Sequence, residues 1–194
     1  MNPVLPFDLR LTQAAFAESP YGAGSPRRLS EMKDSFADIQ AAEAILRTDD
    51  PVIYEFHALR QIEARQKLIF GLTTIYAGTV GDEYYMTKGH FHAAEHDGDE
   101  IYQVIQGAGH LLLQARDGSA QTIRMQSGAL YYTPTTWAHR TVNSGDEALV
   151  FLSIWAWDVG YDYETISDRG GFPQRILKSS GEPVAAANAN FHLA

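Results

Sequence analysis

From residue 52 to residue 157 the sequence is a series of short runs rich in β-branched and aromatic residues, and no helical stretch separates them. The runs include VIYEF, LTTIY, IYQVI, HLLLQ, ALYYT and ALVFLSIW. Between them lie turn signals such as AGTVGD, GAG, RDGS, QSG and NSGDE. Many short segments at this spacing, linked by turns rich in glycine and polar residues, predict an all-β antiparallel sandwich or barrel.

The sequence on either side of these runs has a different composition and pattern. Residues 1–50 combine coil containing proline and glycine with one predicted helix, SEMKDSFADIQAAEAILR, capped by Ser30. Residues 51–177 are expected to form the β-domain, and residues 178–194 a loosely held tail. Because the chain has 194 residues and is 45% hydrophobic, it can bury one full core, and we expect a single domain overall.

Charge and cysteine content narrow the function classes. A net charge of -9 disfavours nucleic acid and anionic membranes as partners, since both attract clustered Lys and Arg. The absence of cysteine excludes disulfides and thiolate metal sites, so a metal would need nitrogen and oxygen ligands. The start, MNPVLPFDLR, lacks a signal-peptide pattern, and no segment has 18 uninterrupted apolar residues, so we expect a cytoplasmic protein.

The segment TKGHFH contains two histidines one residue apart at the start of a predicted strand. Positions i and i+2 of a strand share a face, so His90 and His92 can point into one cavity while Phe91 points away. Glu100 opens the next run and is the preferred third ligand, because a strand would hold it in place. Its competitors in the preceding loop are Glu95, His96, Asp97 and Asp99. With His139 at the start of a later strand, the set would form a mixed N/O metal site.

These residues resemble the two-part signature of the cupin family. The first part is His90, His92, Glu100 and Gly107, and the second is Gly128, Pro134, His139 and Asn143. The combination of TKGHFH, a long loop before the glutamate and WAHRTVN further resembles the cupin-type glucose-6-phosphate isomerases, and the similarity runs from about Arg28 to Phe172. The resemblance implies a double-stranded β-barrel with the N-terminal helix packed outside.

The resemblance also implies a reaction, the interconversion of glucose 6-phosphate and fructose 6-phosphate. One divalent metal per subunit would be bound by the three histidines and the glutamate, with Fe(II) favoured and Mn(II), Ni(II) or Zn(II) also admissible. The catalytic residues would be Glu100, Tyr102 and His139. The isomerisation could use Glu100 as the base of an enediol route, or a hydride shift in which Glu100 is mainly a ligand, and the sequence leaves both open.

A site for the sugar phosphate is the next implication. The resemblance implies that Thr73, Thr87 and Gly89 surround the substrate, and Lys88 or Arg140 could supply a cation for the phosphate dianion.

Two positions depart from the family pattern: Trp155 stands where a tyrosine is usual, and Tyr161 where a histidine is usual. Trp155 keeps an aromatic surface and an N–H donor but lacks the hydroxyl, and Tyr161 cannot be a cation near neutral pH. Lower activity or a related sugar phosphate as substrate is a hypothesis that follows.

Two other functions are compatible with such a site. A cupin with these ligands could be an Fe(II) dioxygenase, or a sugar-binding module that keeps its metal without turnover. The isomerase interpretation leads because the family's separate motifs occur together in one chain. The resemblance also implies a homodimer, and small barrels of this kind often pair through exposed edge strands.

Overall fold

The computed structural model describes residues 8, 10–19, 22–59, 67–93, 98–157 and 159–193. Its strands are β1 (Gly22–Arg28), β2 (Val52–Leu59), β3 (Leu68–Ile75), β4 (Thr79–Val80), β5 (Glu83–Tyr84), β6 (Phe91–His92), β7 (Glu100–Gln106), β8 (Ala108–Ala115), β9 (Ala120–Gln126), β10 (Leu130–Thr133), β11 (Trp137–Val142), β12 (Leu149–Ala156), β13 (Tyr161–Asp162), β14 (Gln174–Ser179) and β15 (Glu182–Ala187). Its helices are α1 (Gln13–Glu18), α2 (Leu29–Met32), the 3-10 helix η1 (Lys33–Ser35), α3 (Ile39–Leu46) and α4 (Glu164–Asp168). Within these described ranges, no helix has the length and apolar character needed to span a membrane.

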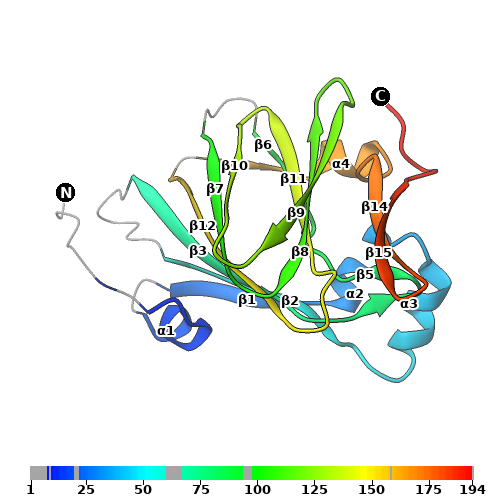
Figure 1. Ribbon diagram of the computed structural model, residues 1–194, viewed down its shortest axis with the longest axis horizontal. Coiled ribbons are helices and arrows are strands. Elements are labelled where there is room, and N and C mark those ends of the chain that lie inside the picture. The colour runs from blue at the N-terminus through cyan, green and yellow to red at the C-terminus, as the bar shows by residue number, and fades with distance from the viewer. Residues whose placement is uncertain are drawn as a thin grey trace.

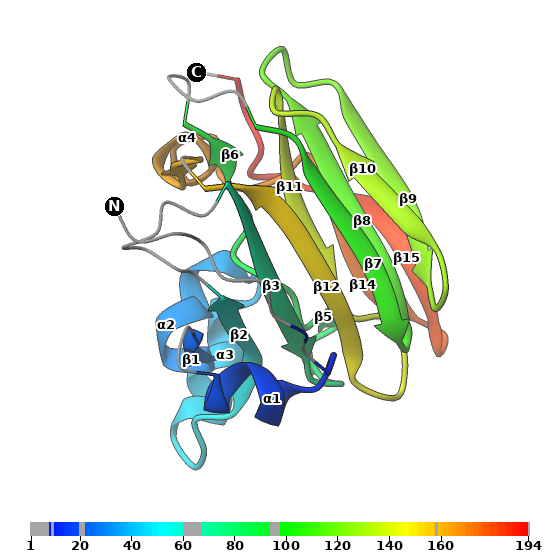
Figure 2. The same ribbon diagram turned by 90° about the vertical axis from the view of Figure 1, so that its left-hand side faces the viewer.

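Two antiparallel layers face each other (Figure 1). One layer is a six-stranded sheet in the order β1-β2-β3-β12-β7-β10. The other layer contains the sheet β11-β8-β9. Two isolated β-bridges, Met86↔Val142 and His90↔His139, connect this sheet to the segment that leads into β6. A four-stranded sheet, β15-β14-β5-β4, lies beside this second layer (Figure 2). The prediction of an all-β fold built from antiparallel strands is confirmed.

Side-chain alternation places the core between the layers. On β7, Glu100, Tyr102 and Val104 are buried, whereas the residues between them face outward and are less buried. Val104 packs in one apolar cluster with Leu111 and Met125 from the opposite layer. Fully burying such a side chain stabilises the folded state by about 1.5–3 kcal/mol. The apolar residues of this inner face therefore hold in place the polar residues that lie among them.

The single helix predicted from Ser30 is wrong, because the structure divides this stretch into α2, η1 and α3. Ser30 does not act as the predicted cap; its N–H and hydroxyl donate to the Asp50 carboxylate at 2.9 and 2.7 Å. Phe36 is extended (φ -89°, ψ 148°) and ends the 3-10 turn. Asp38 then starts α3 by accepting a hydrogen bond from the Ala41 N–H at 2.8 Å. The helical segments still pack on the outside of the β-layers (Figure 2).

Strands also form where the sequence predicted irregular chain. Gly22–Arg28 pairs antiparallel with β2 at the edge of the large sheet, where we expected coil. Near the C-terminus, β14 and β15 form a hairpin, so a strand, β15, lies where we expected a loose tail. Its turn residues, Ser180 (φ 52°) and Gly181 (φ 89°), both have the positive φ that a tight hairpin turn needs.

Candidate metal centre and substrate cavity

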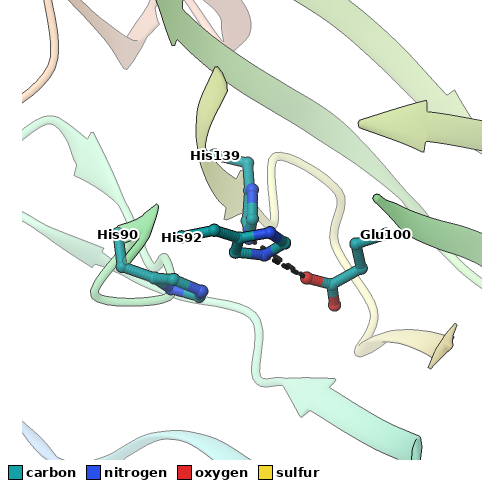
Figure 3. A group of neighbouring side chains, drawn as sticks. All are labelled: His90, His92, Glu100 and His139. Carbon is teal, nitrogen blue, oxygen red and sulfur yellow. Dashed lines mark hydrogen bonds and ion pairs between the residues drawn. The ribbon is translucent and has the colours of Figure 1, made fainter. Parts of the chain in front are cut away.

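The four predicted metal ligands converge on one point inside the fold. His90, His92, Glu100 and His139 each offer a donor atom, and these atoms lie within 4.8 Å of one another. Figure 3 shows the three imidazoles and the carboxylate turned toward a common centre. Backbone hydrogen bonds of 3.2 and 3.0 Å between His90 and His139 hold their two segments together. The structure therefore brings together residues that are far apart in the sequence.

The hydrogen bond at the far side of His92 determines what that ring presents to the cluster. Its Nδ1 lies 2.5 Å from the carbonyl oxygen of Gly98, which can only accept, so Nδ1 carries the proton. In the neutral ring Nε2 then presents a lone pair to Glu100 Oε2, 3.4 Å away. Two acceptor atoms facing each other in a buried site repel, unless a cation lies between them.

The remaining donor atoms are also suited to a cation. His139 Nε2 lies 3.3 Å from the same Glu100 oxygen. Both ring nitrogens of His139 and Nε2 of His90 are buried and make no hydrogen bond within the described residues. Burial, followed by the neighbouring His139, holds the pKa of His90 well below its usual value. For Glu100, burial opposes ionisation, but the neighbouring imidazoles of His139 and His92 outweigh it and lower the pKa of the carboxyl.

Neutral imidazoles and an ionised carboxylate are the protonation states that bind a metal. The donor set and its burial therefore fit a divalent first-row ion. Of the competing ligands, Glu95, His96 and Asp97 lie outside the described residues. Asp99 is exposed, and its carboxylate accepts hydrogen bonds from the Tyr132 hydroxyl and the Thr135 N–H instead.

A cavity of about 720 Å³ opens beside the cluster, and His90, Glu100 and His139 form part of its wall. All the predicted substrate residues reach it, although they come from different strands and loops. These residues are Thr73, Thr87, Lys88, Gly89, Tyr102, Trp155 and Tyr161. Gly89 has φ +71°, and a Cβ there would lie 2.6 Å from the Phe172 ring, so this turn requires glycine.

Arg140, the alternative cation for the phosphate, faces away from the cavity. It alternates with His139 and Thr141, which do line the cavity. Its guanidinium is buried, donates to the Lys88 carbonyl at 2.7 Å and lies 4.8 Å from the Phe172 ring centre. Burial lowers the pKa of Arg140 to about 10, so it stays charged at neutral pH. Lys88 is therefore the one of the two predicted cations that reaches the cavity.

The two residues that depart from the family pattern occupy different parts of the site. Trp155 is 3% exposed and forms cavity wall, with its ring 6.1 Å from that of Phe56. Tyr161 is 39% exposed and lies edge-on to His90, with ring centres 4.8 Å apart. It also stacks on Tyr163 at 6.0 Å. The first substitution changes the cavity wall, and the second changes the ring beside a proposed metal ligand.

Sequence reasoning missed six polar residues of the cavity: Arg27, Glu31, Tyr54, Thr141, Ser153 and Tyr163. Lys88 Nζ lies 4.7 Å from the Tyr163 ring centre, which places a cation at this side of the cavity. Tyr163 could have been found from its i+2 spacing to Tyr161. Arg27 gave no signal, because β1 was predicted to be coil.

A two-layer β-fold in which three histidines and one glutamate face a cavity is the arrangement that the sequence predicted for a cupin with a metal site. The sequence model of the family "Glucose-6-phosphate isomerase (GPI)" matches residues 26–191, and the chain belongs to this family. Proteins named glucose-6-phosphate isomerase are similar to it along most of their length. The one from Pyrococcus abyssi is 44% identical over 162 residues, covering 84% of this chain and 85% of the relative.

More distant similarities extend the comparison. The glucose-6-phosphate isomerase of Sinorhizobium medicae is 36% identical over 171 residues, covering 88% of this chain and 78% of the relative. Among solved structures, oxalate decarboxylase from Bacillus subtilis at pH 4.6 is 27% identical with a TM-score of 0.44, covering 52% of this chain and 25% of that one.

Proposed function

We propose that this chain is a metal-dependent aldose-ketose isomerase that interconverts glucose 6-phosphate and fructose 6-phosphate. The observation that carries the proposal is one cavity that joins the histidine-glutamate cluster to all the predicted substrate residues. Its volume of about 720 Å³ lies within the range of small-molecule sites. Membership of the isomerase family and relatives with that name support the same reaction.

The phosphate would bind at the turn that contains Thr87, Lys88 and Gly89. Lys88 supplies a cation, and its charge-assisted hydrogen bonds to a phosphate are stronger than neutral ones. The Thr87 hydroxyl oxygen accepts from the Thr141 N–H at 3.1 Å, which leaves its own O–H to donate. Thr73 is buried on β3 and offers a second hydroxyl in the same cavity. A phosphate anchored there leaves the sugar chain to extend toward the metal cluster.

His90, His92, Glu100 and His139 would hold one divalent metal, with Fe(II) favoured and Mn(II), Ni(II) or Zn(II) as alternatives. When bound, such an ion polarises a sugar oxygen and stabilises the negative charge that develops on it. Tyr102 keeps its proton, because burial and then the neighbouring Glu100 raise its pKa well above the usual value. Its hydroxyl can therefore donate to Glu100 or to the sugar chain.

Two routes for the hydrogen transfer remain distinct. Glu100, ionised in the folded protein, can accept the C2 proton in an enediol route, and it is a ligand alone in a hydride shift. Turnover in D2O separates the routes. Deuterium in the product would indicate the enediol route, and its absence at full conversion would indicate direct hydride transfer.

The experiment that tests the proposed reaction is a panel of sugar phosphates assayed by product formation. The proposal predicts that fructose 6-phosphate has the highest kcat/KM. Preference for another sugar phosphate would contradict the substrate, and oxygen uptake without isomerisation would favour a dioxygenase. Reverting Trp155→Tyr together with Tyr161→His should raise kcat/KM for glucose 6-phosphate, and no change would count against a role for these two departures.

A homodimer is part of the proposal, as is a place in glycolysis and gluconeogenesis in the cytoplasm. The outer face of the six-stranded sheet supports the dimer, because it exposes Leu68, Leu130 and Tyr132 by 50%, 64% and 54%. Light scattering tests this expectation, and a monomer at assay concentration would overturn it.

A further inference from the structure

A chain of hydrogen bonds leads from the protein surface to the back of His92. The Gly98 carbonyl accepts from His92 Nδ1 at 2.5 Å, and the Gly98 N–H donates to Thr135 Oγ1 at 3.2 Å. The Thr135 N–H in turn donates to the Asp99 carboxylate at 3.0 Å. The Asp99 carboxylate also accepts a hydrogen bond from the Tyr132 hydroxyl. The chain thus connects residues that the proposed reaction does not use to one of the metal ligands.

Packing and pairing restrict the carbonyl at the centre of this chain. Gly98 lies against Val159, since a Cβ on Gly98 would come within 2.3 Å of Val159 Cγ2. Thr133, two residues before Thr135, pairs directly with Glu100 across β10 and β7. The peptide of Gly98 is therefore held from three sides: by Val159, by Thr135 and by the β7 strand that follows it.

We propose that Thr135 and Asp99 are positioning residues for His92. They hold the Gly98 carbonyl against Nδ1, which keeps the proton on that nitrogen and leaves Nε2 free to face Glu100 and a bound metal. Without the anchor, the ring could rotate or adopt the other tautomer, in which Nε2 carries a proton and cannot ligate. Outer hydrogen-bond partners of this kind change metal affinity by about 10- to 100-fold.

The inference rests on the proposed metal site, and it is independent of the isomerase reaction. Its test is therefore the dissociation constant of Zn(II), measured on metal-stripped protein by competition with a chromophoric chelator at fixed pH. Thr135→Val removes the Oγ1 acceptor and keeps the size of the side chain. Asp99→Ala removes the carboxylate at an exposed position. We expect the zinc dissociation constant to rise about 10-fold or more in each variant.

Both changes act through one carbonyl, so their effects should not add. The zinc dissociation constant of the double variant should equal that of the single variant that binds zinc less tightly, and should not rise by the product of the two fold-changes. Thr122→Val is the matched control: it also removes a threonine hydroxyl that bonds to a side chain, Gln174, but this pair has no link to His92. The control should bind zinc like the parent. Equal weakening in the control would attribute the effect to general loosening and overturn the proposal.

A spectroscopic signature separates positioning from loss of folding. Long-range ¹⁵N spectra of the metal-free parent should show His92 as the Nδ1–H tautomer, and Thr135→Val should shift it toward a mixture. An unchanged tautomer together with an unchanged zinc dissociation constant would overturn the inference. If Thr135→Val does not fold by circular dichroism, Asp99→Ala alone decides between the same two outcomes.

Discussion

Replacing Tyr102 by phenylalanine removes one hydroxyl beside Glu100 and preserves the ring. That ring is 5% exposed and packs edge-on against His139 and Phe151, with ring centres 5.8 and 5.4 Å away. Glu100 is ionised and the neighbouring Tyr102 hydroxyl can donate to it, so the variant removes the donor of a hydrogen bond to a charged group. Such a bond contributes about 1.5–3 kcal/mol. If it is retained in the transition state, kcat/KM falls by about 10- to 150-fold.

The assay is the coupled conversion of fructose 6-phosphate to glucose 6-phosphate with saturating metal. Tyr131→Phe is the matched control, because Tyr131 lies directly opposite Tyr102 on β10 but its hydroxyl accepts from the Gln126 N–H at 2.9 Å. The control should retain the parental kcat/KM. Equal rates for both variants would refute the assigned role of the Tyr102 hydroxyl.

Three further perturbations have expected outcomes. Glu83→Gln leaves Arg175 buried without the carboxylate oxygens 2.7 and 2.9 Å from its Nη1, and should cost about 3–5 kcal/mol in urea unfolding. Adding Arg175→Met should recover part of this loss, and no recovery would contradict the pairing. Lys88→Met should raise KM for fructose 6-phosphate about 5- to 10-fold with a smaller change in kcat, since one charge-assisted contact is lost; an unchanged KM would remove Lys88 from the phosphate site. Gly89→Ala should lose about 1–2 kcal/mol in thermal unfolding from its positive φ alone, and more from the contact with Phe172; parental stability would contradict the required turn.

The sequence predicted the β-layers well because the information for them is local. Two-residue alternation and turn signals determine which side chains face inward, and the same rule placed His90 and His92 on one face. The prediction of one N-terminal helix was wrong because of a contact with a distant part of the chain. Its apolar spacing continues through Phe36, but the Ala37 N–H bonds to the Glu83 carboxylate at 2.8 Å, and this contact from another strand accompanies the break in the helix.

The site shows the same division between local and tertiary information. The spacing of the proposed ligands and the family's motifs were sufficient to nominate all four residues of the histidine-glutamate cluster. The position of Arg140 could have been predicted from the sequence. Adjacent residues of a strand point to opposite faces, so with His139 facing the cavity, Arg140 had to face away from it. Arg27 and Tyr54 could not be found, since only the pairing of β1 with β2 brings that edge of the sheet to the cavity.

The measurement that tests the central claim most directly is isomerase activity as a function of the amount of metal bound to the protein. The protein is stripped with chelator, assayed with fructose 6-phosphate, and reassayed after separate additions of Fe(II), Mn(II), Ni(II) and Zn(II). The account predicts no activity in the stripped protein, activity that rises in proportion to metal up to one ion per chain, and none in His139→Ala. Full activity in metal-free protein, or metal-loaded protein that does not convert the substrate, would contradict it.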